Sequence, residues 1–110
     1  MAYPLNRIEH RWGRRFRVNI PVRAAVSSSK IDCRLRNLSL SGALMKSDHN
    51  FRLNSLIDVF IGLPLPAVGH ATVKAHVTRK LDEAVAIEWC EFAPPAVKVL
   101  LRASQVRGAP

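Results

Sequence analysis

The sequence predicts an all-β-dominated domain, a six-stranded antiparallel β-barrel with a C-terminal α-helix. Three observations predict it. Apolar residues alternate with polar ones through the middle of the chain, turn-forming residues separate the alternating segments, and the period becomes helical after the last segment. Closing short antiparallel strands into a barrel removes the edges that an open sheet exposes. A chain of 110 residues can bury one modest core, so we expect one domain.

Six segments carry the strand pattern. Between residues 31 and 36, apolar side chains alternate with Asp32, Arg34 and Arg36, and the segments 71–78 and 85–90 repeat this two-residue period. The run 56–63 is rich in β-branched residues and ends before a proline. The predicted strands lie near residues 17–26, 30–38, 41–47, 55–63, 68–80 and 84–92. We expect the aromatic residues Phe60, Trp89 and Phe92 to help build the core.

The last segment has a helical period. Two prolines suited to a helix start precede Val97, Leu100 and Leu101, which recur at helical spacing. We therefore expect a helix over 94–106 and a single domain over 10–106. Its parts are an arginine-rich arm (10–17), a barrel (17–92) and the helix, with a flexible N-terminal tail (1–9) and a short C-terminal tail (107–110).

Charge is concentrated near the N-terminus. The net charge is +9, and residues 1–36 hold nine Lys/Arg against two acids, whereas the remaining residues hold eight against six. A strongly basic segment favours an anionic partner. We therefore expect the functional residues to lie mainly in the N-terminal third.

Other features narrow the class of protein. No apolar run is long enough to span a membrane and no signal-peptide pattern opens the chain, so we expect a cytoplasmic protein without membrane insertion. The two cysteines, Cys33 and Cys90, lie in strand-like segments without a CxxC pair, which favours buried reduced thiols. No histidine spacing, nucleophile motif or glycine-rich phosphate loop indicates an enzyme or a metal site.

Two short motifs stand out. The stretch HRWGRRFRVNIPV begins at His10 and contains Arg11 and Arg15 as an R-x-x-x-R pair. The stretch RNLSLSGALMKS begins at Arg36 and contains Asn37, Ser39 and Gly42 as N-x-S-x-x-G. Taken alone, the second motif reads as a tight turn in which glycine supplies a positive φ.

Together, and in this order inside a small β domain, the two motifs resemble the PilZ domain family, whose members are bacterial receptors for cyclic di-GMP. The segment RVNIPV after Arg15 also resembles the family's entry into its first strand, so the resemblance covers nearly the whole chain. It implies a non-enzymatic receptor that binds cyclic di-GMP through Arg11, Arg15, Asn37, Ser39 and Gly42. The residues suit this ligand, because a guanidinium can pair with phosphate or guanine bidentately and can stack on a purine.

The arm also departs from the family pattern. His10 stands where many members carry an extra arginine associated with a stacked ligand dimer, which favours one ligand per site unless Arg14 substitutes. Trp12 either packs on the barrel or stacks on a base. Arg79 either borders the pocket or is a solvated arginine at a strand end. These four are further candidate contacts.

Two other functions are weighed against the receptor. A PilZ-like protein-interaction module without ligand would typically lack the arginine pair, which is present here. A basic barrel that binds single-stranded nucleic acid would need stacking aromatics, but aromatic residues make up only 6% of the chain, with no strand interleaving them with basic residues. The resemblance implies that binding orders the arm and presents a new surface to a downstream protein. The sequence does not identify that protein, the process it serves, the oligomeric state or the affinity.

Overall fold

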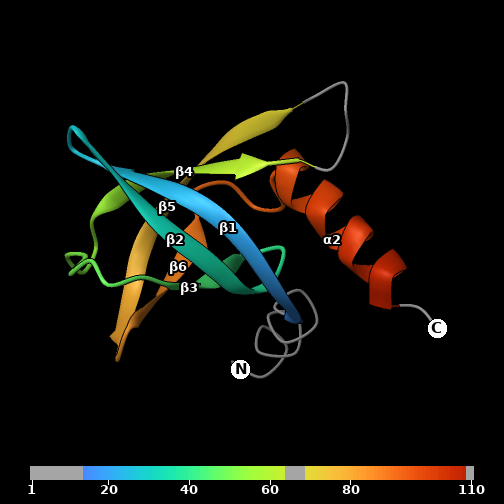
Figure 1. Ribbon diagram of the computed structural model, residues 1–110, viewed down its shortest axis with the longest axis horizontal. Coiled ribbons are helices and arrows are strands. Elements are labelled where there is room, and N and C mark those ends of the chain that lie inside the picture. The colour runs from blue at the N-terminus through green and yellow to red at the C-terminus, as the bar shows by residue number, and fades with distance from the viewer. Residues whose placement is uncertain (1–13, 64–68, 109–110) are drawn as a thin grey trace, which may run out of the picture.

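The computed structural model describes residues 14–63 and 69–108 and has the predicted architecture of six strands and one C-terminal helix (Figure 1). The elements are β1 (Phe16–Val26), β2 (Ser29–Leu38), β3 (Gly42–Lys46), β4 (Leu56–Gly62), β5 (His70–Leu81), β6 (Ala84–Trp89) and α2 (Pro95–Gly108). The last strand ends three residues earlier than predicted, because its partner β3 begins at Gly42, opposite Glu88. The helix includes two residues of the predicted C-terminal tail, whereas the predicted tail 1–9 lies outside the described residues.

The strands close into a barrel in the order β1-β2-β3-β6-β5-β4, with antiparallel neighbours throughout. Strand β1 completes the ring by pairing with β4, with Val22 opposite Ile61. Two bulges meet near the end of β2. The β2–β3 register shifts between Leu35 and Asn37 of β2. The β1–β2 register shifts between Arg17 and Ile20 of β1, which lie opposite that part of β2. As a result, the consecutive residues Arg36 and Asn37 both stay out of the core.

The alternating apolar residues fill the barrel, as predicted. Every strand contributes buried inward residues, and Phe51, from the loop before β4, is fully buried with them. Phe16, Val18 and Ile20 at the start of β1 are partly buried and pack against this core. Trp89 is buried as expected, but the predictions for the other two aromatics were wrong. Phe60 lies between inward-facing Val59 and Ile61, so the two-residue period turns it outward, where Lys30 lies 4.9 Å from its ring. Phe92 follows the end of β6 and is 55% exposed.

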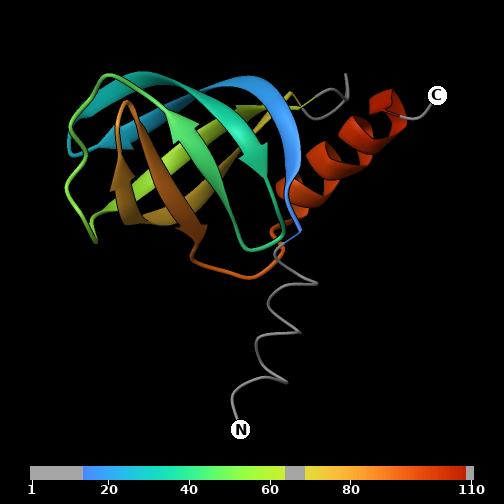
Figure 2. The ribbon, with the colours of Figure 1, turned by 90° about the horizontal axis from the view of Figure 1, so that it is seen from below.

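Helix α2 lies against one side of the barrel rather than across its interior (Figures 1 and 2). Its buried residues recur at helical spacing and pack mainly toward β1 and β5. They are Ala96, Val97, Leu100 and Leu101. Among the described residues, no helix is long and apolar enough to cross a membrane.

The two cysteines have different environments. Cys33 faces inward on β2 and is buried, and burial raises the pKa of its thiol. Cys90 is exposed, contrary to the prediction, because it follows inward-facing Trp89 and β6 has already ended. Both thiols are free.

Candidate functional site

The register of β1 and β2 brings the two sequence motifs together. Arg17 pairs with Asn37, so Arg15, just before β1, lies at the same end of β2. The Nη1 of Arg15 donates a hydrogen bond to Asn37 Oδ1 at 2.7 Å, across 22 positions of sequence. The other predicted residues of the arm, His10, Arg11 and Trp12, lie outside the described residues. The motifs therefore meet through at least one direct contact.

Asn37 presents amide donors to the outside of the barrel. Its Oδ1 accepts from Arg15 and also from the backbone N–H of Leu44, at 3.0 Å. Both partners are donors, which fixes the orientation of the side-chain amide. Within the described part of the chain, nothing accepts a hydrogen bond from Nδ2. Its two N–H groups can therefore bind an acceptor such as a phosphate oxygen or the O6/N7 edge of guanine.

Ser39 organises the turn between β2 and β3. Its side chain is fully buried, and Oγ accepts from the backbone N–H of Gly42 at 3.1 Å and of Ser41 at 3.3 Å. The hydroxyl also lies 3.1 Å from the Gly42 carbonyl, to which it can donate. Trp89 Nε1 donates to the Ser39 carbonyl at 3.1 Å, which ties the turn to the end of β6. In this conformation the hydroxyl points into the turn, so a direct ligand contact by Ser39 stays a prediction.

Gly42 is needed for close strand packing. It is not among the positive-φ residues of the described chain, so the interpretation that it supplies a positive φ was wrong. A Cβ at this position would lie 2.1 Å from the Ile87 carbonyl oxygen and 3.1 Å from Glu88 Cα. Only glycine therefore lets β3 approach β6 this closely. A contact between Gly42 and a ligand stays a prediction.

Two further candidates, Arg14 and Arg79, lie among the described residues. The Arg14 guanidinium lies 5.2 Å from the centre of the Phe16 ring, a cation–π contact at the start of β1. Arg79 is exposed on β5 and belongs to the same row of paired residues as Asn37. That row crosses three strand spacings, about 14 Å in all. Arg79 can therefore border a ligand on this face only at its far edge.

Sequence reasoning missed two residues of this row. The pairing runs from Asn37 to Leu44 and on to Ala86, and then to Arg79. Leu44 and Ala86 are half-buried on the outer face, where a strand of this kind usually carries polar residues. They form a small apolar floor on which a purine ring can lie. The sequence carried a signal for Leu44, because Ala43, Leu44 and Met45 are three consecutive apolar residues where a half-buried strand would alternate.

The electrostatics of the face favour an anion. Arg15, Arg17 and Arg79 are all exposed there. The acid Glu88 lies on β6, two residues along the strand from Ala86 and opposite Gly42. Its Oε1 is 3.5 Å from His76 Nε2. No group of three or more His, Cys, Asp or Glu side chains in the described ranges is placed to hold a metal ion.

Comparison with known proteins is consistent with this geometry. The family model for the PilZ domain matches residues 6–104. The PilZ domain of CeSA from a cellulose-synthesizing bacterium superposes with a TM-score of 0.64 at 16% identity, over 87% of this chain and 99% of that one. Bacillus subtilis MotI/DgrA, an inhibitor of motility, gives 0.68 at 20% identity over 84% of this chain and 48% of that one. The uncharacterized Legionella protein Lpg0364 gives 0.57 at 14% identity, over 87% and 99%. No curated protein sequence matches the chain.

Proposed function

This chain belongs to the PilZ domain family, and on that premise we propose that it is a non-enzymatic receptor for the second messenger cyclic di-GMP. PilZ domains are generally receptors for this ligand. The observation that carries the proposal for this chain is the hydrogen bond from Arg15 to Asn37, which joins the arginine motif to the turn motif. Both side chains reach the outside of the barrel, where a ligand can meet them together.

The face supplies groups that match the ligand. Cyclic di-GMP carries two phosphates and two guanines. Arg15, with Arg11 from the same motif, would pair with phosphate or with the guanine O6/N7 edge, and the Asn37 amide would donate to a second acceptor. A guanine would lie over Leu44 and Ala86. In this arrangement Ser39 and Gly42 would act chiefly by shaping the turn that holds Asn37.

Relay of the signal would use the same contact. The Arg15 guanidinium donates a hydrogen bond to Asn37 Oδ1. A phosphate or guanine would compete for its N–H groups and order the arm, residues 10–17. The differential contact between the two states is what allows a ligand to shift their populations. The changed surface would then be recognised by a downstream protein.

The test is a calorimetric titration with cyclic di-GMP, using GTP and a short single-stranded oligonucleotide as controls. We expect binding of the cyclic dinucleotide alone, and the stoichiometry would distinguish one ligand from two. Arg15→Ala should weaken binding by about 2 kcal/mol or more, roughly thirtyfold, because it removes a charged hydrogen-bonding partner. The matched variant Arg52→Ala, an exposed loop arginine, should bind normally. Equal affinities for the two variants would show that the pocket has been misplaced.

The main alternative is a PilZ-like interaction module that does not bind the ligand. One observation favours the interaction module. Ser39 and Gly42 have structural roles that any protein with this turn would need, whether or not it binds a ligand. Arg15, by contrast, is exposed and has no structural role in the core, so its presence favours the receptor. A folded protein that binds no cyclic di-GMP would favour the interaction module, and oligonucleotide binding would instead favour a nucleic-acid function.

A further inference from the structure

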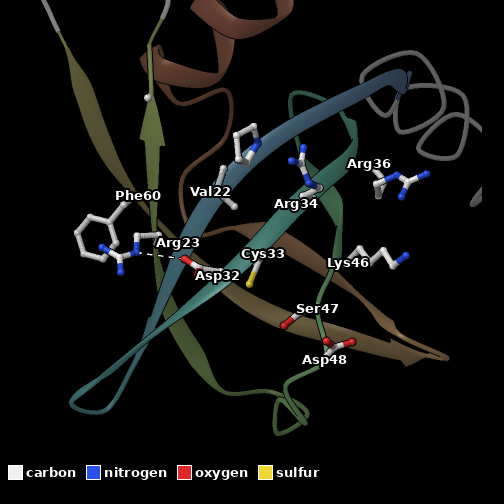
Figure 3. Close-up of a pocket in the computed structure, with 12 residues that line it drawn as sticks. Val22, Arg23, Asp32, Cys33, Arg34, Arg36, Lys46, Ser47, Asp48 and Phe60 are labelled. Atoms are coloured by element: carbon white, nitrogen blue, oxygen red, sulfur yellow. Dashed lines mark hydrogen bonds and ion pairs between the residues drawn. The ribbon is translucent and has the colours of Figure 1, made fainter.

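The outer face of the barrel carries a second, separate feature, an open groove of about 660 Å³ over β1, β2, β3 and β4 (Figure 3). Half of its twelve lining residues are charged. The charged side chains are Arg23, Asp32, Arg34, Arg36, Lys46 and Asp48. Phe60 lies at the end that holds Arg23 and Asp32 (Figure 3).

Three cations of the groove, Arg34, Arg36 and Lys46, form no ion pair with a described acid. Arg34 on β2 lies directly opposite Lys46 on β3, and like charges in that position destabilise a sheet. The only hydrogen bond of the Arg34 side chain within the described ranges is to a neutral group, Asn19 Oδ1, at 3.0 Å. Arg36 and Lys46 have no hydrogen bond or ion pair with any described residue. A bound anion between the strands would relieve this repulsion.

The acids of the groove lie together toward one end. Asp32 forms an ion pair with Arg23, at 3.3 Å. Because β3 runs antiparallel to β2 and Lys46 lies opposite Arg34, Asp48 lies on the same side of that pair as Asp32, whereas Arg36 lies toward the other end. Acids at this end would repel the uniform phosphate chain of a nucleic acid. A polypeptide can instead carry carboxylates over the cations and a neutral or basic residue beside the acids. Arg34 and Arg36 lie about 7 Å apart along β2, which is also the same-face repeat of an extended peptide.

We propose that this groove is a docking site for an acidic, extended segment of a partner protein. Carboxylates of that segment bind Arg34, Arg36 and Lys46, and one of its ends lies beside Asp32 and Asp48. The proposal does not rest on ligand binding. Because Arg36 directly precedes Asn37, the groove and the candidate ligand site share the bulge of β2, so a docked partner lies next to the surface where the ligand would bind.

The test uses a dye-labelled peptide of alternating glutamate and serine with a lysine at each end, measured by fluorescence anisotropy without cyclic di-GMP. Its failure therefore leaves the receptor proposal untouched. The test variant is Arg34→Gln/Arg36→Gln/Lys46→Gln. The matched control is Arg52→Gln/Lys98→Gln/Arg102→Gln, three exposed cations outside the groove. Each variant loses three charges from +9, leaving +6, so the two differ only in where charge is removed.

We expect the groove variant to bind the peptide about tenfold more weakly and the control variant to change by less than about twofold. Circular dichroism checks that both variants are folded. Equal losses in the two variants would show attraction by net charge alone and overturn the proposal, as would absence of binding to the wild-type protein. A labelled single-stranded oligonucleotide runs in parallel. If binding of the oligonucleotide depends on the groove cations and binding of the peptide does not, the groove is a nucleic-acid site and the proposal is wrong.

Discussion

The strongest prediction concerns Gly42, because the structure sets the size of the effect. In Gly42→Ala the new methyl would lie 2.1 Å from the Ile87 carbonyl oxygen, about 1 Å inside a normal contact. The oxygen belongs to the backbone of β6, so no side-chain rotation can relieve the clash, and β3 must move away from β6. Overpacking of this kind costs about 1–3 kcal/mol. Weakening the adjacent bond from Trp89 N–H to the Ser41 carbonyl, now 2.9 Å, costs about 1 kcal/mol more.

We therefore expect Gly42→Ala to lower the free energy of unfolding by about 3 kcal/mol, from a total of about 5–15 kcal/mol for a domain of this size. Urea denaturation followed by circular dichroism measures this change. The thermal midpoint should fall by about 12 °C, at roughly 4 °C per kcal/mol. The matched control is Gly62→Ala at the end of β4, where nothing lies within 4 Å of the added methyl. It should be neutral or stabilise the protein by up to about 1 kcal/mol.

A loss below about 1 kcal/mol in Gly42→Ala, or an equal loss in Gly62→Ala, would refute the reasoning. It would mean that β3 and β6 tolerate a wider spacing and that the glycine of the N-x-S-x-x-G motif is not required for packing. A large loss of stability would show instead that this glycine has a structural reason to be present whether or not a ligand binds.

Three further predictions concern single side chains. Ser39→Ala should lower the free energy of unfolding by about 1–3 kcal/mol, because it removes a buried acceptor from two backbone N–H groups; urea denaturation measures this, and an unchanged midpoint would contradict the turn described. Lys46→Glu should raise stability by about 0.2–1 kcal/mol at low salt, because it replaces a like-charge pair with Arg34 by an ion pair; a decrease would show that the two side chains do not face each other. Cys90 should react readily with a thiol reagent in the native protein, whereas Cys33 should react much more slowly, since burial lowers access to its thiol and raises its pKa; equal rates would contradict the burial.

The sequence by itself determined the class of fold. A two-residue period specifies a strand with one buried face, and the change to a helical period at Val97 specifies a helix. Both signals are local, and for this reason all six strands and α2 appear in the predicted order, with ends that differ from the prediction by up to three residues. The outward position of Phe60 was also readable, because Ile57, Val59 and Ile61 already occupy the inward positions of the same strand. The prediction of a core position for Phe60 relied on its aromatic side chain, whereas the two-residue period of the strand predicts an outward position.

Only the tertiary structure decided how the motifs work. The contact between Arg15 and Asn37 depends on the register of β1 against β2 and on a bulge, which no local pattern specifies. The role of Gly42 depends on a backbone oxygen 45 positions away in sequence, at Ile87. The opposition of Arg34 and Lys46 likewise exists only once β2 and β3 pair. Sequence periodicity reports which face of a strand is buried, whereas strand pairing decides which side chains meet, and that depends on the whole closed barrel.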